Sequence, residues 1–344
     1  MPAVDSTGAT FRMPLGRDRG PAMQVFYSDT FELPLPEGHQ FPAEKYQRVR
    51  EWLQASSLSR ELDFKLPPAA TDQQLLRVHT TEYLEKLKSG ALSRIEQRRI
   101  GFPWSPEMVE RHRRSAGATL AASRAALRDG AGVHLAGGTH HGFPDHGEGF
   151  CVFNDVAVSV RNLQAEGLIN RAVVIDLDVR QGNGTAAIFA DDPEVFTFSM
   201  HGERNFPQVK EGSDIDIMLP DGTTDARYLA ELTTALAEKL PFDRDLAFFL
   251  AGADCYGGDR YGRLKLTKAG IAERDRLVFE ACRQQGLPVT VVMAGGYSKR
   301  IEDIVDINVA TIRTLLATMG GSGGEPDGTD SDRLCRLRGS SRNS

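Results

Sequence analysis

Cysteine is scarce in this chain of 344 residues, and the cysteines that occur are far apart. There are four of them, with no CxxC pair, at Cys151, Cys255, Cys282 and Cys335. This spacing excludes a disulfide framework and a cysteine-based zinc knuckle. Long hydrophobic runs are missing too, since no stretch approaches the roughly 20 apolar residues of a membrane helix, and the N-terminus has no signal-peptide pattern. We therefore expect a cytoplasmic protein without a membrane partner.

An excess of positive charge is also lacking. The formal net charge at pH 7 is −6. Proteins that bind nucleic acid through bulk electrostatics present a basic face that displaces counterions from phosphates. The charge balance therefore argues against a nucleic-acid partner, and nothing in the sequence predicts an oligomeric state.

Low-complexity segments occur at both ends of the chain. Residues 1–22 mix Gly, Pro, Ser, Arg and Asp without periodicity, and residues 320–344 are rich in Gly, Ser and charge. Both compositions are typical of disorder. With no internal repeat or linker between them, we expect a disordered leader at 1–22, one domain at 23–319 and a disordered tail at 320–344.

Short apolar or β-branched runs alternate with longer segments of helical period across this domain. We expect strands at residues 133–136, 172–177, 195–199, 246–250 and 289–293. We expect helices at 106–127, 155–166, near 228–239, and at 267–285, the last with Thr267 as N-cap. Alternation of this kind predicts an α/β fold with a mostly parallel sheet covered on both faces.

Polar residues follow the expected strands, where ligands of open α/β sheets bind. The groups are Gly137-Gly138-Thr139-His140-His141 after the first strand, Asp176 and Asp178 at the end of the second, His201 after the third, Asp254 after the fourth and Gly295-Gly296-Tyr297 after the fifth. Five strands therefore direct polar groups toward one crevice.

Carboxylates and histidines dominate this set. Asp176 and Asp178 are two residues apart on a strand, so both face one side, and two like charges so close need a cation or a proton. Asp254 adds a third carboxylate, and Asp and His ligands with an open position suit a catalytic zinc. Taken alone, the Asp pair also fits a solvated turn.

The remaining polar residues suit proton transfer. His140 and His141 are interpreted as metal ligands or as general bases beside a metal, although an isolated pair is more often structural. Asp176 is a candidate partner that orients one imidazole. Tyr297, on a glycine turn, could donate a hydrogen bond to an oxyanion or simply pack over a loop.

Several ordered motifs resemble those of the histone deacetylase superfamily, and specifically its class IV and bacterial deacetylase-like branch. They are GGTHHGFPDHGEGFCVFNDVAV, VVIDLDVRQGNGTA, FSMHGERNFP, LAGADCYGGDRYGRLKLT and MAGGYSKRIEDIVDINVAT, and the resemblance spans residues 23–319. It implies the arginase-deacetylase fold, a three-layer α/β sandwich. It also implies hydrolysis of an N-acyl amide, with acetyl-lysine as the typical substrate.

The resemblance implies a role for each matching residue. Asp178 and Asp254 match zinc ligands, and Asp176 matches the carboxylate behind the first of the two proton-handling histidines, His140 and His141. Further matches are Tyr297 to the oxyanion-stabilising tyrosine and Gly149, Phe150 and Phe206 to the walls of the acyl channel. The segment from Asp176 to Arg180, with Ser199, resembles the family's structural monovalent-cation loop.

Two positions depart from the family pattern. The DxDxH motif ends in Arg180, where the third zinc ligand is expected. A guanidinium stays protonated and has no lone pair to offer a metal, and it could instead pair with Asp178 or Asp254. We therefore expect strongly reduced zinc affinity. Asn183 stands where many relatives carry an Asp behind the second histidine, which predicts a less basic His141.

Three functions compete on this pattern. The leading hypothesis is a zinc-dependent hydrolase that removes an acyl group from lysine, a polyamine or another small amine, with activity impaired by Arg180. The alternative is a catalytically inactive deacetylase scaffold that binds acyl-lysine. An arginase-like enzyme with two manganese ions shares the fold, but too few histidines lie near the strand ends to support it.

Overall fold

The computed structural model describes residues 22–320. The leader expected at 1–22 and the tail expected at 320–344 lie outside the described residues, except for Ala22 and Gly320. Among the described residues, no helix has the length and apolar character needed to cross a membrane.

One eight-stranded sheet forms the centre, and every neighbouring pair of its strands is parallel. The strand order is β2-β1-β3-β8-β7-β4-β5-β6. The strands are β1 (Met23–Phe26), β2 (Leu62–Lys65), β3 (Ala131–His134), β4 (Ala172–Asp176), β5 (Val195–Gly202), β6 (Ile215–Leu219), β7 (Leu246–Leu250) and β8 (Val289–Val292). Because all strands point the same way, their carboxyl ends meet at one edge.

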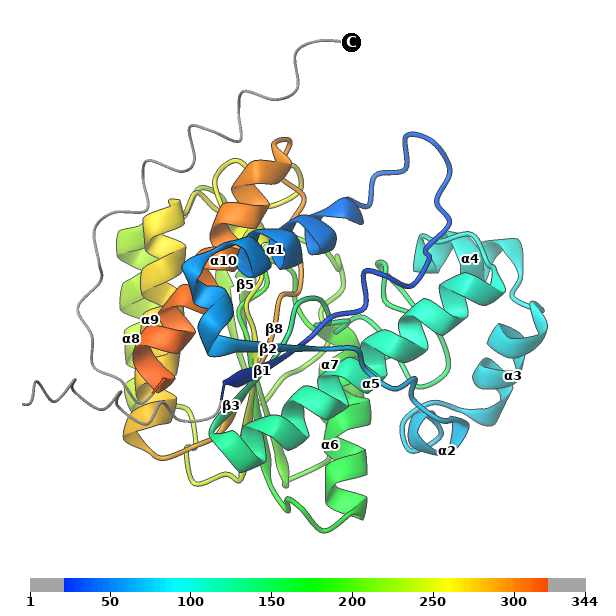
Figure 1. The fold of residues 1–344 in the computed structure, drawn as a ribbon, viewed down its shortest axis with the longest axis horizontal. Helices are drawn as coiled ribbons and strands as arrows, with labels where there is room; N and C mark the ends of the chain where they lie inside the picture. The colour runs from blue at the N-terminus through cyan, green and yellow to red at the C-terminus, as the bar shows by residue number, and fades with distance from the viewer. Residues whose placement is uncertain (1–21, 321–344) are drawn as a thin grey trace, which may run out of the picture.

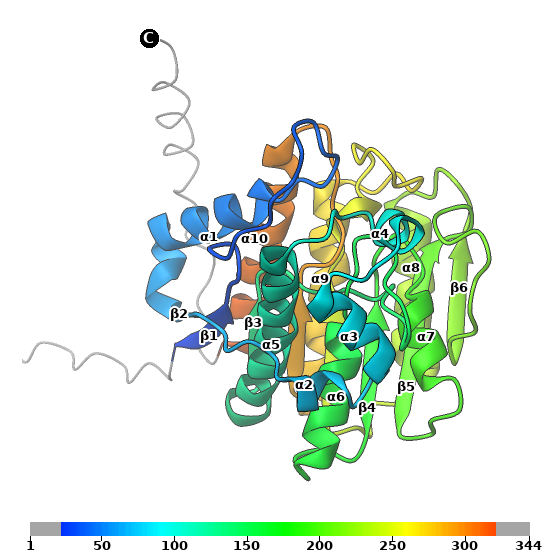
Figure 2. The ribbon, with the colours of Figure 1, turned by 90° about the vertical axis from the view of Figure 1, so that its right-hand side faces the viewer.

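Helices cover both faces of the sheet, which makes a three-layer α/β sandwich (Figures 1 and 2). On one face lie α5 (Pro106–Asp129), α6 (Asp155–Ala165) and α7 (Asn183–Phe189), with α2 (Asp72–Leu75), α3 (Thr81–Ser89) and α4 (Arg94–Ile100) outside them. On the other face lie α1 (Glu44–Ala55), α8 (Asp225–Glu238), α9 (Lys268–Gln284) and α10 (Ile301–Met319). The predicted fold class is confirmed.

The central strands show why the chain folds this way. The sequences of β4 (AVVID) and β7 (LAFFL) are almost wholly apolar, and every residue in them is buried. Such continuous runs suit strands that helices cover on both sides. The two faces of the sheet bury separate clusters of large apolar side chains, one around Phe249 and Phe279 and one around Phe248 and Phe189.

The expected helices are present with small shifts at their ends. Ser105 caps α5 by accepting the Met108 amide, and Gly130 ends it in a left-handed conformation with φ 88°. Thr267 caps α9 as predicted, accepting the amide of Gly270 at 2.9 Å. Side-chain caps followed by a left-handed glycine are strong local signals, which explains the agreement.

Two strand predictions were displaced. The first strand covers Ala131–His134 rather than 133–136, because the small residue Gly132 lets α5 pack closely: a Cβ there would lie 2.0 Å from the carbonyl oxygen of Ala122. The third extends to Gly202, since Met200 and His201 still pair with β6. His201 therefore lies inside β5 and not after it.

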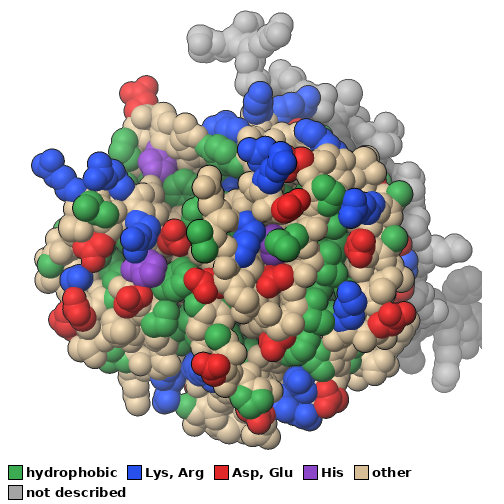
Figure 3. Space-filling view, turned by 180° about the vertical axis from the view of Figure 1, so that it is seen from behind, with side chains coloured by type: hydrophobic (Ala, Val, Ile, Leu, Met, Phe, Trp, Pro, Cys, Tyr) green, Lys and Arg blue, Asp and Glu red, His purple; other side chains and the backbone are tan. Residues whose placement is uncertain are grey.

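The surface carries both signs of charge. In the face that Figure 3 presents, Lys and Arg side chains are mixed with Asp and Glu. The expectation that the protein has no nucleic-acid partner stays a prediction.

Candidate active site

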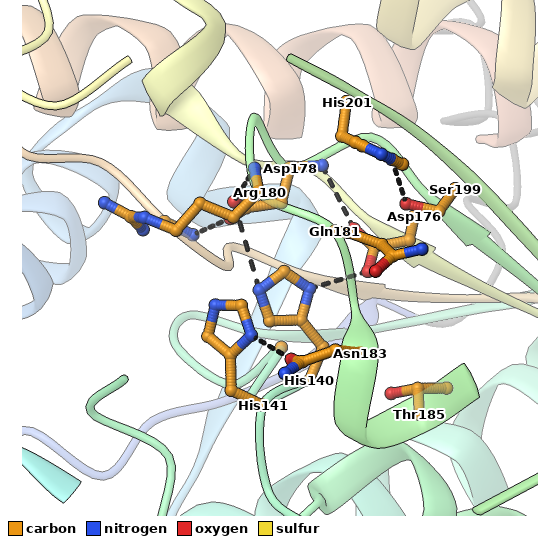
Figure 4. A network of polar contacts seen from close by, with 12 residues as sticks. His140, His141, Asp176, Asp178, Arg180, Gln181, Asn183, Thr185, Ser199 and His201 are labelled. Carbon is orange, nitrogen blue, oxygen red and sulfur yellow. Dashed lines mark hydrogen bonds and ion pairs between the residues drawn. The ribbon is translucent and has the colours of Figure 1, made fainter. Parts of the chain in front are cut away.

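The carboxyl edge of the sheet gathers most of the residues singled out in the sequence. His140 and His141 come after β3, Asp176 and Asp178 come at the end of β4, and Asp254 lies in a short 3₁₀ helix after β7. Figure 4 shows the two imidazoles side by side next to the segment from Asp176 to Arg180. Tyr297 reaches the same pocket from the loop after β8.

A tight loop presents the two histidines. Gly137 and Gly138 have φ values of 78° and 71°, which side-chain-bearing residues rarely adopt. Asp155, the first residue of α6, accepts the amides of Gly138 at 2.9 Å and Thr139 at 2.8 Å, so its carboxylate fixes the loop. Asp155 was not predicted as a positioning residue, because no motif or spacing in the sequence links it to the histidine loop.

His140 is held in a positively charged state. Its Nδ1 lies 2.6 Å from Oδ2 of Asp176, and its Nε2 lies 3.9 Å from Oδ1 of Asp178. Burial lowers the pKa of His140, but the charges of Asp176 and Asp178 outweigh burial and raise the pKa to about 9. His140 is therefore an imidazolium near neutral pH.

His141 is held in the opposite state. Asn183 donates its amide N–H to Glu148 at 3.2 Å, so its Oδ1 accepts the Nδ1 proton of His141 at 2.6 Å. Burial and the neighbouring charge of His140 lower the pKa of His141 well below its ordinary value. Its Nε2 then carries a lone pair, and within residues 22–320 this buried atom has no hydrogen-bond partner. Such a nitrogen can accept a proton from a molecule in the pocket.

The three carboxylates of the site all accept hydrogen bonds within the protein. Asp176 accepts from His140 and from the amide of Asp178, and Asp178 accepts from the amides of Arg180 at 2.9 Å and Gly295 at 2.7 Å. Asp254 accepts from the amide of Val179 at 3.0 Å and from the Arg180 guanidinium at 3.2 Å. Every oxygen of the three side chains therefore accepts a hydrogen bond within the protein.

Arg180 folds into the site instead of pointing away from it. Its side chain is 12 % exposed, its guanidinium pairs with Asp254, and its Cζ lies 4.4 Å from the centre of the Tyr297 ring. Tyr297, Asp254 and Asp178 raise the pKa of Arg180 against the effect of burial, so it stays protonated. Burial and the charge of Asp178 raise the pKa of Asp254 to about 7, although Arg180 opposes the shift.

These residues do not fit a zinc ion. A catalytic zinc needs three protein ligands with lone pairs, but Asp178 and Asp254 are accompanied by a guanidinium that bonds one of them. Across residues 22–320, no three or more His, Cys, Asp or Glu side chains are grouped to hold a metal ion. The positive charge that balances Asp254 comes from Arg180.

Aromatic side chains enclose the pocket. Phe150 stacks with Tyr297 at 6.0 Å between ring centres, and Phe206 meets His141 edge-on at 4.9 Å. Gly149, Phe150 and Tyr297 line a narrow pocket with a cavity volume of about 60 Å³, together with both histidines and Arg180. Phe206, which was also predicted as a channel wall, is 37 % exposed and is not among the residues that line this pocket, although its ring contacts His141. A pocket with an apolar wall and a polar floor suits a short aliphatic chain that ends in a polar group.

Lys45 is a second residue that the sequence analysis missed. It is a buried lysine on α1, and its Nζ donates to the carbonyls of Gly296 at 3.2 Å and Ala294 at 3.4 Å, on either side of Gly295. Burial lowers its pKa to about 8, against the attraction of Asp254 and Asp178. The ammonium group thereby braces the turn that carries Tyr297. Its neighbours in sequence gave no signal of this role.

The segment predicted to hold a monovalent cation lies at the same edge. Ser199 Oγ is 2.9 Å from Nδ1 of His201, and Asp176 Oδ1 accepts the amide of Asp178. The cation itself stays a prediction.

Comparison with known proteins decides the family. The protein-family model described as "Histone deacetylase domain" matches residues 39–312 of this chain. The chain belongs to the histone deacetylase family. The chain is 32% identical over 285 residues to the histone deacetylase-like amidohydrolase of Pseudomonas aeruginosa, which covers 77% of this chain and 74% of that protein. It is 30% identical over 302 residues to histone deacetylase 2 of Arabidopsis thaliana, covering 84% and 77%.

Two further similarities agree with this histone deacetylase membership. An uncharacterised protein of Picosynechococcus is 42% identical over 282 residues, covering 82% of this chain and 94% of that one. The crystal structure of the HDA15 HD domain superimposes with a TM-score of 0.70 at 22% identity, covering 86% of this chain and 91% of that one. At this identity the second match shows the fold alone, which is that of a histone deacetylase domain.

Proposed function

We propose that this histone deacetylase family member acts on an N-acylated amine, such as acyl-lysine, as an amide hydrolase whose activity Arg180 holds down. The observation that carries the proposal is the pair of adjacent imidazoles beside Tyr297 in one pocket, one bonded to a carboxylate and the other to an amide oxygen. Amide hydrolysis needs a base for water, a donor for the developing oxyanion and a channel that positions the acyl group.

Each role has a candidate in the pocket. The free Nε2 lone pair of His141 takes a proton from the attacking water as the C–O bond forms, and His141 returns this proton to the departing amine as the C–N bond breaks. The His140 imidazolium stabilises negative charge beside it. Burial raises the pKa of Tyr297 well above its ordinary value, so its hydroxyl keeps the proton that it donates to the oxyanion. Gly149, Phe150 and Phe206 serve as walls for the acyl chain.

The predicted zinc ion conflicts with the position of Arg180. Zinc in this family would polarise the acyl carbonyl, but Arg180 bonds Asp254 and supplies no lone pair. We expect zinc to bind weakly or not at all to the unaltered chain, and turnover to be low as a result. Residues 23–319 are proposed as the deacetylase-like domain. The expected monovalent cation stays a prediction, whereas the Arg180–Asp254 pair argues against the expected zinc.

A specific observation favours a second function, acyl-lysine binding without hydrolysis. Arg180 supplies the positive charge that Asp254 would otherwise take from a metal ion, while the pocket and its aromatic walls are still present. A chain of this kind would recognise the acyl group and release it unchanged.

The two functions are separated by turnover and binding measured on the same protein. The assay uses a fluorogenic acetyl-lysine reporter and a long-chain acyl reporter, with Arg180→His as the partner variant and His141→Ala as the inactive control. The proposal expects weak turnover that Arg180→His raises by at least about 100-fold, because an intact ligand set matters more than the supporting contacts, which alone give 10- to 100-fold effects. Binding without turnover in both proteins would favour the second function, and neither binding nor turnover would refute both.

A further inference from the structure

A second pocket lies beside the aromatic wall of the channel. Its lining combines the helix α4 with the loop that follows it and with His39, an early residue of the chain. The lining residues are His39, Arg94, Gln97, Arg98, Gly101, Phe102 and Pro103. None of these residues belongs to the site described above.

The arginines of α4 are free of ion pairs. Arg94, Arg98 and Arg99 are exposed, and within the described part of the chain none of them lies within 4 Å of a carboxylate. Other cations of the same region are compensated: Lys86 pairs with Glu82 and Glu96, and Lys88 pairs with Asp72 and Glu85.

Arg94 and Arg98 lie on the same face of α4. Arg94 and Arg98 are four residues apart on one helix, a spacing at which like charges repel. Both also line one side of the same pocket. Two arginines in the lining of one pocket, together with Phe102, form a surface that matches an anionic partner.

Direct contacts join this pocket to the channel. The ring of Phe102 lies 5.3 Å from that of Phe150, and His39 lies 6.0 Å from Phe150. Backbone hydrogen bonds tie the two segments together, since the amides of Gly149 and Phe150 donate to the carbonyls of Arg99 and Ile100. The two pockets therefore adjoin through the rings of Phe150, Phe102 and His39, and a ligand long enough to leave the channel can extend to the pocket that Arg94 and Arg98 line.

We propose that Arg94 and Arg98 form an anion-binding subsite that selects acyl-lysine flanked by acidic residues in a peptide. The inference rests on the proposed function, because the acyl-lysine must occupy the channel for its neighbours to reach this pocket. An extended peptide advances about 3.4 Å per residue, so Asp or Glu two or three positions from the acyl-lysine can reach it. The same charge disfavours acylated polyamines, whose remaining amines are cationic.

The test compares three acetyl-lysine peptides that differ only in residues two and three positions away: Glu, Gln or Lys. Fluorescence anisotropy gives their affinities for the full chain, for Arg94→Glu/Arg98→Glu, and for the control Arg128→Glu/Arg283→Glu. The control changes the net charge by the same amount at two exposed positions far from the site. Arg128 and Arg283 lie in the last turns of α5 and α9, which lead into the amino ends of β3 and β8, at the edge of the sheet opposite to the site.

The subsite predicts that the Glu peptide binds the unaltered chain about fivefold to tenfold more tightly than the Gln peptide, and that the Lys peptide binds least tightly. Raising the salt concentration should shrink this preference. Arg94→Glu/Arg98→Glu should reverse the order of the Glu and Lys peptides, whereas the control pair should retain it.

Two failures have different meanings. Equal affinity for all three peptides, or an unchanged order in Arg94→Glu/Arg98→Glu, would overturn the subsite and leave acyl-lysine recognition intact. Absence of binding by every peptide would overturn the proposed function and the subsite with it.

Discussion

The site divides into two halves that differ in what they keep of the family pattern. In the imidazole half, His140 with Asp176, His141 with Asn183, and Tyr297 stand ready for proton transfer. In the carboxylate half, Asp178 and Asp254 share their surroundings with a guanidinium.

Arg180 stands where a zinc ligand is expected, yet the neighbouring carboxylates keep their positions and their hydrogen-bond partners. Arg180 provides a positive charge at the carboxylates, and backbone amides saturate the remaining oxygens. Each oxygen of Asp178 and Asp254 therefore has a hydrogen-bond partner within the protein, so neither carboxylate is left as an unsatisfied buried acceptor. The imidazole half meanwhile keeps its geometry, since its partners come from β4 and α7 and do not depend on Arg180.

The largest expected effect comes from removing the internal cation. Arg180→Met leaves Asp254 buried without its guanidinium, which costs about 3 kcal/mol of unfolding free energy at pH 8. The folded pKa of Asp254 is already raised above 3.8, to about 7, so its favourable contribution is complete below pH 3.8 and is lost as the pH rises through 7. The loss should therefore be much smaller at pH 5.

Denaturant unfolding at pH 5 and pH 8 measures this difference. The control is Arg180→Met/Asp254→Asn, which removes the buried charge as well and should recover most of the loss at pH 8. An equal loss at both pH values would show that Arg180 does not balance Asp254.

The next effect concerns the imidazole half. His140 has a folded pKa of about 9 against an ordinary 6.5, so its contribution to stability is complete below pH 6.5 and disappears as the pH rises through 9. A shift of this size corresponds to roughly 3 kcal/mol. Asp176→Asn removes the strongest attraction and should flatten this part of the stability curve. The unfolding free energies of the unaltered chain and of Asp176→Asn are measured at pH 6 and pH 9.5. An equal change between the two pH values in both proteins would contradict the pairing of His140 with Asp176.

The smallest effect concerns the second imidazole. Asn183→Asp places a charge at Nδ1 of His141 and should raise its pKa by about 1 to 2 units. Titration followed by NMR of the imidazole protons reports the change. Asn183→Ala is the matched control, because it removes the hydrogen bond without adding charge and should not raise the pKa. A rise in both variants would mean that the added charge is not what raises the pKa of His141.

Much of the fold was predictable because its signals are local. Buried runs such as those of β4 and β7, and the caps of α5 and α9, depend on neighbouring residues alone. The strand ends were less predictable, since the end of β5 depends on pairing with β6, which is distant in sequence.

The candidate site was predictable where ordered motifs carried it, as for His140, Asp178 and Arg180. Lys45 and Asp155 were not predictable, because their roles depend on contacts across 249 and 17 residues of sequence. A charged residue looks like an ordinary surface residue until the fold buries it. The roles assigned to the site residues remain proposals that the variants above can test.

The central claim, that Arg180 takes the place of a metal ion, is tested most directly by zinc content. The unaltered chain and Arg180→His are purified side by side, exposed to excess zinc, dialysed and analysed for metal per chain. The account predicts far less than one zinc per chain in the unaltered protein and close to one in Arg180→His. One tightly bound zinc in the unaltered chain would contradict it.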